Sequence, residues 1–383
     1  MYPAKLKNFL GKIFEMKICF IAHNLDIGNG DGRFAFSLIE TLQRDFGVET
    51  SVFVERGQKE LLGAKAVLHA RGAIKKFILN PILIAKSIKG EKVDVIHAFD
   101  AWPRGVWAFF ASLLAGIPFG MTIYATYGTM PLTKFFKGFL LRWAYKKSAL
   151  NAAISQITAE RIERLAPKVK VKVINQGIDF QKYQGQANHQ RITNEPYILT
   201  VAYMKFRKGF HIAIPVFAEV KKTFPKLKYV VRAAPSDAKY FEEIKKMAFD
   251  LGVGKDIIWL PYLEESGLID VYKNAEVFFF PALYSNPFYF EGFAATPMEA
   301  QACGIPVVKT KMSDKKTGEE IIDNETGILV EENNVGEAAE ALKKILGDKN
   351  LRKKFSKNAV EFARSLDWKL KAREYLDYYQ KIK

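Results

Sequence analysis

Short apolar runs alternate along this chain with longer stretches in which apolar residues recur at helical spacing. The run at residues 17–22 is followed by an amphipathic stretch at about 34–45 and by a second run at 47–54. This order predicts two buried parallel strands joined by a helix. A glycine-rich loop, residues 28–33, follows the first strand, on the side where open parallel sheets bind ligands.

The same alternation occurs in each half of the chain. Further strands are predicted at residues 93–97, 119–124, 149–154 and 171–174, and in the second half at 197–202, 228–232, 257–260 and 277–280. Because 383 residues exceed what one core comfortably holds, we expect two domains. The polar stretch 184–195 is typical of a linker. We therefore predict an α/β protein with one domain in residues 1–190 and a second of the same kind in 191–365.

Residues 105–133 contain no charged side chain, so a membrane-spanning helix has to be considered. Gly116, Pro118 and Gly120 interrupt this stretch, and a proline in the middle of a helix breaks it. We therefore expect a helix before these residues and the strand at 119–124 after them, rather than a span. The N-terminal residues lack the long apolar core and the small-residue cleavage site of a signal peptide.

The amino-acid composition is that of a soluble globular protein. Hydrophobic residues make up 49% of the chain and charged residues 26%, as in soluble globular proteins. The two cysteines, Cys19 and Cys303, lie far apart in apolar surroundings. They predict neither a disulfide framework nor a metal site, and they suit a protein of the reducing cytoplasm.

The formal net charge of +17 is unevenly distributed. Residues 1–190 carry 27 basic and 14 acidic side chains, whereas residues 191–383 carry 31 and 27. The excess in the first half predicts an anionic partner, either a membrane surface, a phosphorylated acceptor or nucleic acid. A solvated lysine-rich face is the alternative. The basic segments contain no recognisable nucleic-acid-reading motif, so we expect no nucleic-acid partner.

Two of the basic segments, residues 61–90 and 134–147, also contain many apolar residues. On a helix, one face of the second segment would carry Phe135, Phe136, Phe139, Leu140 and Trp143, flanked by Lys134, Lys137, Arg142 and Lys146. This pattern fits a helix on a membrane surface, or a helix whose aromatic face enters the core while its basic side is solvated. Residues 1–15 form another basic amphipathic segment, which we interpret as a packed or frayed extension.

Two glutamates mark the strongest candidate site. Glu291 and Glu299 lie between an apolar run at 276–281 and another at 304–308. Glu291 is therefore expected on a strand-to-helix loop and Glu299 inside the helix. The start of a helix presents free N–H groups and a positive dipole end, which favour phosphate. Two acids beside a phosphate site indicate a ligand with both hydroxyl and phosphate groups, such as a nucleotide-sugar.

The residues of this stretch also carry a family resemblance. Glu-Gly-Phe at 291–293, followed by Pro-Met-Glu-Ala-Gln-Ala-Cys-Gly-Ile-Pro-Val-Val at 297–308, resembles the retaining GT-B glycosyltransferases of family 4, the glycosyl transferases group 1. The resemblance covers residues 16–380. It implies two Rossmann-like domains that face each other across a cleft, with a C-terminal helix at residues 366–383 that crosses back to the first domain. Weaker matches lie at residues 93–97, Ser155, 175–179, 208–209 and 325–330.

By this resemblance, the protein transfers a hexose from a UDP- or GDP-sugar to a hydroxyl acceptor, either a glycan or a lipid-linked molecule. The enzyme would be cytoplasmic, with a peripheral association at the inner face of the membrane as a further hypothesis. The second domain would bind the donor and the first would receive the acceptor. A fixed cation would stabilise the leaving diphosphate, so no metal and no further cofactor are expected.

The resemblance assigns roles to individual residues. Glu291 would contact donor-sugar hydroxyls, Glu299 would bind the ribose, and Lys208 would neutralise the diphosphate. Glu291 and Lys208 are the catalytic candidates. The other candidate donor-binding residues are Lys205, Arg207, Gly292, Phe293, Ala294, Ala295 and Thr296. The candidates for the acceptor side of the interdomain cleft are Gly30, Asp31, Gly32, Arg33 and Tyr124.

The chain departs from the family pattern at several positions. Tyr203 stands where the family usually has an arginine, and Tyr124 where it often has a histidine. A glycine pair of the family is replaced at residues 232–235, and residues 285–290 are an insertion. Two alternatives therefore stay open: a nucleotide-sugar epimerase of the same fold, and a nucleotide-sugar-binding protein with little turnover.

Overall fold

The protein is divided by its internal contacts into two compact units. A computed structural model describes residues 16–28, 30–69, 71–72, 75–185, 191–234, 237–261, 263–286, 290–312 and 320–382. The first unit comprises the chain up to Gly177 together with the residues from Trp368 onward, and the second runs from Ile178 to Asp367. The predicted extension at 1–15 and part of the predicted linker, 186–190, lie outside the described residues.

The first boundary between the units therefore falls at residue 177 rather than at the predicted 190. The reason is that the polar residues after it pack with the second unit. Ile178 forms a parallel bridge with Asp367, and the side-chain amide of Gln184 donates to the carbonyl of Ala302 at 2.8 Å. The C-terminal helix begins at Trp368, two residues later than the predicted segment.

The first unit contains a sheet of seven parallel strands in the order β3-β2-β1-β4-β5-β6-β7. The strands are β1 (Lys17–Ile21), β2 (Glu49–Glu55), β3 (Lys65–Leu68), β4 (Val95–Phe99), β5 (Phe119–Ile123), β6 (Leu150–Ala153) and β7 (Lys172–Val173). The order reverses between β1 and β4, which places a topological switch point at their carboxyl ends. Strand β3 was not predicted, because this edge strand is only partly buried and lacks a clear apolar run.

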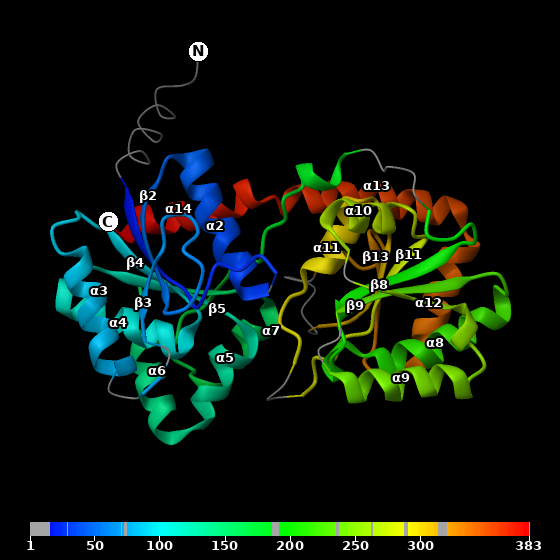
Figure 1. Cartoon of the computed structure of the whole chain (residues 1–383), viewed down its shortest axis with the longest axis horizontal. Helices are drawn as coiled ribbons and strands as arrows, with labels where there is room; N and C mark the ends of the chain where they lie inside the picture. The colour runs from blue at the N-terminus through cyan, green and yellow to red at the C-terminus, as the bar shows by residue number, and fades with distance from the viewer. Residues whose placement is uncertain are drawn as a thin grey trace, which may run out of the picture. The chain divides into compact units, whose positions relative to one another are not determined.

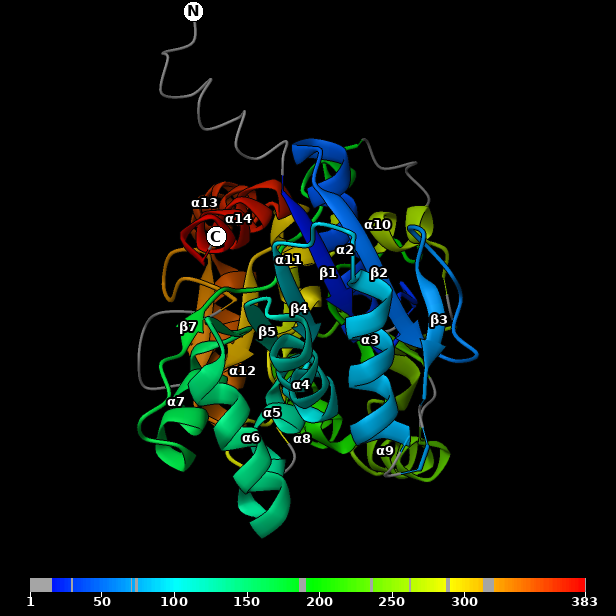
Figure 2. The same ribbon diagram turned by 90° about the vertical axis from the view of Figure 1, so that its left-hand side faces the viewer.

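Helices cover both faces of this sheet. They are α2 (Gly30–Phe46), α3 (Asn80–Ile88), α4 (Val106–Ala115), α5 (Ala125–Thr129), α6 (Phe135–Lys147), α7 (Gln156–Leu165) and α14 (Trp368–Ile382). Cys19 and Ile21 of β1 share a core with residues of α3, α4, α6 and α7. The ring of Phe20 packs against His97, whose ring contacts Tyr375 and Tyr379 of α14 on the other face. Helix α2 packs with α14 on that face (Figures 1 and 2). Successive side chains of β1 thus pack into the cores on opposite faces of the sheet.

The C-terminal helix α14 returns to the first unit, as predicted. Its Tyr375 and Tyr379 are fully buried and pack edge-on against the ring of His97 on β4. The Oη of Tyr375 lies 2.8 Å from Oγ1 of Thr122, which lies 2.9 Å from Nε2 of His97. Burial lowers the pKa of His97 to about 3, so this imidazole is neutral and belongs to the core.

The second unit repeats the architecture with six parallel strands in the order β10-β9-β8-β11-β12-β13. They are β8 (Tyr197–Tyr203), β9 (Lys228–Ala234), β10 (Ile257–Leu260), β11 (Val277–Phe280), β12 (Val307–Thr310) and β13 (Gly327–Val330). Helix α8 (Phe210–Thr223) packs with α9 (Ala238–Asp250) and α12 (Val335–Gly347). Helix α11 (Ala295–Ala302) packs with α10 (Glu265–Lys273) and α13 (Lys349–Ser365).

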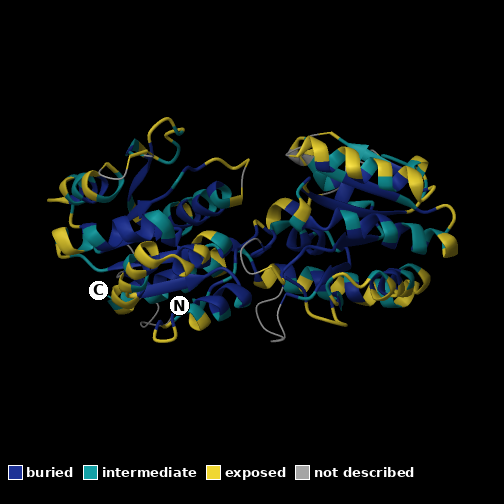
Figure 3. Cartoon of the chain, turned by 90° about the horizontal axis from the view of Figure 1, so that it is seen from below, coloured by how far each residue is buried: buried dark blue, intermediate teal, exposed yellow. Residues whose placement is uncertain are grey.

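Burial follows these layers in both units. The central strands are buried almost throughout, the edge strands β3, β7, β10 and β13 are partly exposed, and the helices expose their outer faces (Figure 3). The uncharged stretch at 105–133 contains helix α4 and strand β5, as predicted, and Gly116 ends the helix in a left-handed conformation. In the part of the chain that the structure describes, no helix is both long enough and apolar enough to span a bilayer.

We expect Tyr375→Ala to lower the free energy of unfolding by roughly 3–5 kcal/mol, because it removes a buried ring and the hydroxyl partner of Thr122. Guanidinium unfolding followed by tryptophan fluorescence measures this loss. Tyr378→Ala is the matched control, since Tyr378 is only half-buried on the same helix and should cost less than about 1 kcal/mol. Equal losses in the two variants would contradict the packing described for α14.

Candidate functional site

The structure places Glu291 on the loop between β11 and α11, as predicted. The backbone N–H of Glu291 donates to the carbonyl of Leu283 at 3.0 Å. The N–H of Leu283 in turn donates to the carbonyl of Arg207 at 2.8 Å. The Glu291 loop is therefore fastened to the loop that follows β8, although the two are far apart in sequence.

Two cations meet the carboxylate of Glu291 on one oxygen. Lys208 Nζ lies 2.7 Å and Arg207 Nε 3.1 Å from Glu291 Oε2. Glu291 is only 7% exposed and Lys208 8%, and the Lys208 ammonium also lies 5.1 Å from the centre of the Phe280 ring. These three side chains form a largely dehydrated charged centre at the carboxyl ends of β8 and β11.

Burial and charge act in opposite directions within this centre. Burial raises the pKa of Glu291, but Lys208 and Arg207 outweigh it and hold that pKa below its ordinary value. Burial lowers the pKa of Lys208, and the nearby Glu291 carboxylate offsets only part of that effect. Glu291 is consequently ionised at neutral pH.

Gly209 allows the lysine loop to approach the β11 loop. Its φ of 74° is left-handed, and a Cβ at this position would lie 1.8 Å from the carbonyl oxygen of Pro281. Any other residue would push the two loops apart. Helix α8 begins at the next residue, so Lys208 is held at the junction of a strand end and a helix start.

A second buried ion pair, not identified from the sequence, adjoins α11. Lys309 Nζ lies 2.7 Å from Glu320 Oε2, and both side chains are fully buried. The backbone N–H of Ala294, which precedes the first turn of α11, donates to Glu320 Oε1 at 2.9 Å. The Glu320 carboxylate also favours the charged form of Lys208, so the two ion pairs belong to one electrostatic neighbourhood. The sequence feature that could have indicated this pair is Lys309, a charged residue inside the apolar run at 305–310.

Glu299 lies inside α11, as predicted, and is held by a neighbouring helix. The hydroxyl of Tyr272 on α10 donates to Glu299 Oε2 at 2.8 Å. Burial and the Glu299 charge together raise the pKa of Tyr272 well above its ordinary value, so the phenol stays protonated and donates. The proposed contact of Glu299 with a ribose stays a prediction.

The remaining donor-side candidates divide into two groups. Gly292, Phe293 and Ala294 are buried in the loop before α11, and Ala295 and Thr296 are half-buried in its first turn. Lys205 belongs to the loop after β8, and its ammonium lies 5.6 Å from the centre of the Tyr203 ring. Arg207, rather than the residue at 203, supplies the second cation beside Glu291.

The predicted residues of the first unit gather at the start of α2. Gly30, Asp31, Gly32 and Arg33 form the first turn of this helix rather than a loop, which corrects the predicted start at residue 34. The structure brings Tyr124 to this turn, because its hydroxyl donates to the carbonyl of Asp31 at 3.3 Å.

Contacts with the preceding loop also hold the start of α2. The Nε of Arg33 donates to the carbonyl of Ile27 at 3.0 Å. A Cβ at Gly32 would lie 2.1 Å from Asn24 Oδ1, so only glycine lets this turn close onto the end of β1.

Four charged or ionisable side chains beside this turn were not singled out from the sequence. Arg104 Nη1 lies 2.8 Å from Glu55 Oε1, and Arg104 Nη2 lies 3.7 Å from Asp100 Oδ2. Nδ1 of His23 lies 3.2 Å from Glu55 Oε2. These residues lie at the end of β2 or follow β1 and β4, at the topological switch point of the sheet. The sequence feature that could have indicated them is a charged or ionisable residue at or after the end of an apolar run.

Asp100 is the most unusual member of this group. It is buried, its φ of 87° is left-handed, and its Oδ1 accepts the N–H of Ala101 at 2.7 Å. Burial raises the pKa of Asp100 to about 7, although Arg104 and the Ala101 N–H oppose the shift. Among the described residues of either unit, no three histidine, cysteine or acidic side chains are grouped as metal ligands would be.

Comparison with known protein families gives matches over most of the chain. The family model described as Glycosyltransferase Family 4 matches residues 28–182, and that described as Glycosyl transferases group 1 matches residues 182–362. D-inositol 3-phosphate glycosyltransferase from Kribbella flavida is 30% identical over 227 residues, covering 56% of this chain and 52% of that protein. A Nocardia farcinica protein of the same name is covered to 51%, so the chain spans about half the length of these two relatives.

Solved structures agree with the fold. A glycosyltransferase from Rickettsia africae gives a TM-score of 0.78 at 18% identity, covering 96% of this chain and 98% of that one. Anabaena HepE in complex with UDP gives 0.78 at 16% identity, covering 96% and 100%. The same protein in complex with UDP-glucose gives 0.73 at 17% identity over the same shares. These likenesses confirm the predicted GT-B fold of two Rossmann-like domains.

We expect Asp100→Asn to change how stability depends on pH. The pKa of Asp100 is near 7 in the folded chain, against an ordinary 3.8, so the folded state holds its proton more tightly than the unfolded state. The stability that this proton contributes is complete below about pH 4 and is lost as the pH rises through about 7. Asparagine has nearly the same size and shape as aspartate and cannot ionise, so it removes this loss.

Melting temperatures at pH 5, 6, 7 and 8 measure the effect. The melting temperature of Asp100→Asn relative to the wild type should rise across this series. Asp250→Asn, at an exposed position of the second unit, should follow the wild type. Parallel pH profiles for Asp100→Asn and the wild type would contradict a neutralised Asp100.

Proposed function

Because the chain belongs to the family 4, group 1 glycosyltransferases of the GT-B fold, we propose that it transfers a hexose from a nucleoside-diphosphate sugar to a hydroxyl acceptor. One observation carries the proposal: Arg207 and Lys208 meet the buried carboxylate of Glu291 at the strand ends of the second unit. That arrangement provides fixed positive charge and an oriented acceptor of hydrogen bonds in one place.

The energetics of the centre favour a role in binding rather than in stability. A buried ion pair gains little net free energy, because removing two charges from water costs about as much as their attraction returns. Buried, strongly interacting charges are characteristic of functional sites. Cleavage of a glycosyl diphosphate leaves negative charge on the diphosphate, and cations already in position stabilise it without reorganisation. We propose this role for Lys208 and Arg207.

The donor is proposed to bind along the loop before α11. Glu291 would accept hydrogen bonds from the sugar hydroxyls, and Glu299, oriented by Tyr272, would bind the ribose. Anabaena HepE, whose fold is similar, has been solved with UDP and with UDP-glucose. We therefore propose a UDP-sugar as the first donor to test and a GDP-sugar as the second.

The acceptor is proposed to bind to the first unit. The first turn of α2 with Tyr124, and the adjoining group of Glu55, Asp100 and Arg104, supply hydrogen-bonding and charged groups at the switch point of that sheet. Such groups suit the hydroxyls of a glycan or of a lipid-linked acceptor. The buried Cys19 and the half-buried Cys303 are both free thiols, which suits the proposed cytoplasmic location.

Transfer is proposed to retain the configuration of the sugar. The acceptor hydroxyl would attack on the face from which the diphosphate leaves, and the departing diphosphate would take the proton of that hydroxyl. This route requires no dedicated side-chain base. The cations of the centre would stabilise the negative charge on the diphosphate while the glycosidic bond breaks.

Donor binding should be visible as a thermal shift in a panel of UDP-, GDP- and ADP-sugars. Ligand at 100 times its Kd stabilises by about 2.7 kcal/mol, which corresponds to roughly 5–10 °C for a unit of this size. We expect one nucleotide to produce this shift, and both Lys208→Ala and Glu291→Ala to reduce it by about half or more, because a tenfold loss of affinity at the same ligand concentration lowers the stabilisation to about 1.4 kcal/mol. Release of nucleoside diphosphate from that donor should fall by about 10²-fold or more in Lys208→Ala.

Lys228→Ala is the matched control for the panel. Lys228 also pairs with a carboxylate, at 2.8 Å from Asp256, but it lies at the amino end of β9. This variant should keep both the shift and the release. The proposal fails if no donor shifts the melting temperature. A shift without any diphosphate release, in the presence of varied acceptors, would favour the alternative of a binding protein with little turnover.

A further inference from the structure

Helix α6 exposes its aromatic side chains to solvent instead of burying them. The exposed fractions are 96% for Phe135, 69% for Phe136, 64% for Phe139 and 42% for Trp143. Single exposed apolar residues are common on protein surfaces, whereas a contiguous group of large ones marks an interaction site. This arrangement overturns the alternative in which the aromatic face of the helix enters the core.

The opposite face of α6 holds the helix on its own unit. Gly138, Leu141, Ala144 and Tyr145 are buried on that side, and Trp143 packs its inner edge against Phe109 of α4, with ring centres 4.8 Å apart. These buried residues attach the helix to its unit, so the exposed aromatic residues are not needed for its packing.

Hydrogen bonds from Arg142, in the middle of the helix, also hold α6 in place. The guanidinium of Arg142 donates to the carbonyl of Leu132 at 2.9 Å and to that of Leu165 at 3.3 Å. These bonds hold α6 to the segments before and after it. The aromatic side chains are consequently presented by a rigid element.

Positive charge surrounds the exposed rings. Lys134, Lys137, Lys146 and Lys147 are all exposed on this helix or at its start. The chain contains no acidic residue between Asp100 and Glu160, so nothing local in sequence neutralises these lysines. The surface formed by the four aromatic residues and these lysines is called the α6 surface below.

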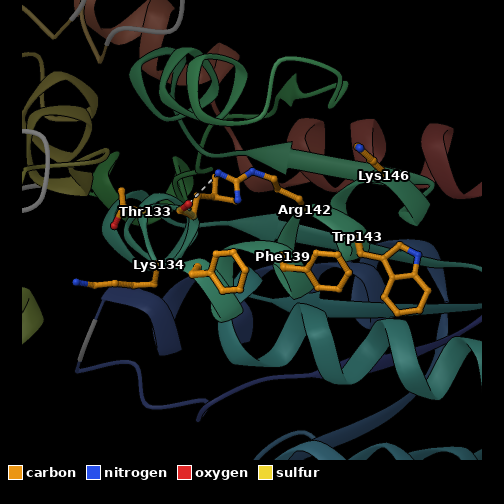
Figure 4. Close-up of a pocket in the computed structure, with 8 residues that line it drawn as sticks. Thr133, Lys134, Phe139, Arg142, Trp143 and Lys146 are labelled. Atoms are coloured by element: carbon orange, nitrogen blue, oxygen red, sulfur yellow. Dashed lines mark hydrogen bonds between the residues drawn. The ribbon is translucent and has the colours of Figure 1, made fainter.

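The α6 surface is hollowed between its rings. A depression of about 700 Å³ is lined by aromatic side chains and by the stems of basic ones (Figure 4). Its lining residues include Lys134, Phe135, Phe139, Arg142, Trp143 and Lys146. Lysine and arginine can lie with their carbon stems along an apolar layer while their charged ends reach polar groups.

We propose that the α6 surface docks on a membrane that contains anionic lipids. The exposed phenylalanines and Trp143 would enter the boundary between headgroups and acyl chains, and the lysines would contact anionic headgroups. Both halves of this chemistry are needed, because apolar contact alone gives no preference for anionic lipid and charge alone does not explain exposed rings.

A second copy of the chain fits the surface less well. A symmetric dimer would bring the same patch of both copies together, so the lysines of one would face the lysines of the other. Like charges at close range oppose that contact. An anionic bilayer supplies both an apolar layer and the opposite charge.

Vesicle flotation tests the proposal with the full chain and no donor. We expect the wild type to float with vesicles made of equal parts of phosphatidylcholine and phosphatidylglycerol at low salt, and not with pure phosphatidylcholine. Raising the salt should weaken binding, because it screens the lysines. Phe135→Ser combined with Phe139→Ser should reduce partitioning into anionic vesicles by about tenfold or more. Lys134→Gln combined with Lys137→Gln should reduce it similarly at low salt.

Phe249→Ser is the matched control, because Phe249 is an aromatic residue that is 80% exposed in the second unit. This variant should float like the wild type, and all variants should keep the wild-type melting temperature, since the changed residues are exposed. Absence of flotation by the wild type, or unchanged flotation of the double phenylalanine variant, would overturn the proposal. The proposal would also be overturned if light scattering without lipid showed a wild-type dimer that the phenylalanine changes convert to a monomer.

Membrane docking is independent of the proposed chemistry. Failure of flotation leaves donor binding and diphosphate release as they were, and failure of donor binding leaves flotation as it was. The two proposals are therefore separately open to rejection.

Discussion

The interaction on which the site depends is the buried contact of two cations with one carboxylate oxygen, that of Glu291. Charges held away from water are costly, so the surrounding chain has to fix their positions. It does so with backbone hydrogen bonds between the two loops and with Gly209, whose missing side chain lets the lysine loop reach Pro281. Buried, strongly interacting charges are characteristic of binding and catalytic sites, and we propose that this centre binds a ligand with matching charge and hydroxyl groups.

Both units use the parallel sheet in the same way. In each, the apolar strands form the core, and charged side chains lie at their carboxyl ends or in the loops that follow them. In the first unit these are Glu55 and Asp100, with Arg104 between them, and in the second they are Glu291 and Lys208. In a doubly wound sheet, the core is formed by the strands and helices, and the loops at that edge contribute less to it. These loops can therefore carry different charged side chains in the two units.

Much of the fold could be predicted because the apolar runs are strong local signals. The strands at 257–260 and 277–280 agree with the prediction to the residue. Strand β3 was missed because an edge strand does not need a continuous apolar run. The unit boundary was misplaced because polarity suggested a linker where residues such as Gln184 pack with the second unit.

Only part of the site could be predicted, for a different physical reason. Glu291, Glu299 and Lys208 lie in recognisable local patterns, whereas the Lys309–Glu320 pair and the approach of Arg207 to Glu291 depend on contacts between distant segments. No local pattern specifies which of Lys205 and Arg207 turns toward Glu291; the backbone of the loop decides it. The α6 surface shows the same limit, since its sequence fitted a core helix and an exposed one equally well.

The most direct test of the charged centre is a calorimetric titration with the nucleoside diphosphate of the preferred donor and with the matching monophosphate. If Lys208 and Arg207 bind the diphosphate, the wild type should bind the diphosphate at least about tenfold more tightly than the monophosphate. This preference should largely disappear in Lys208→Ala, while affinity for the monophosphate changes little. An undiminished preference for the diphosphate in Lys208→Ala would contradict the account.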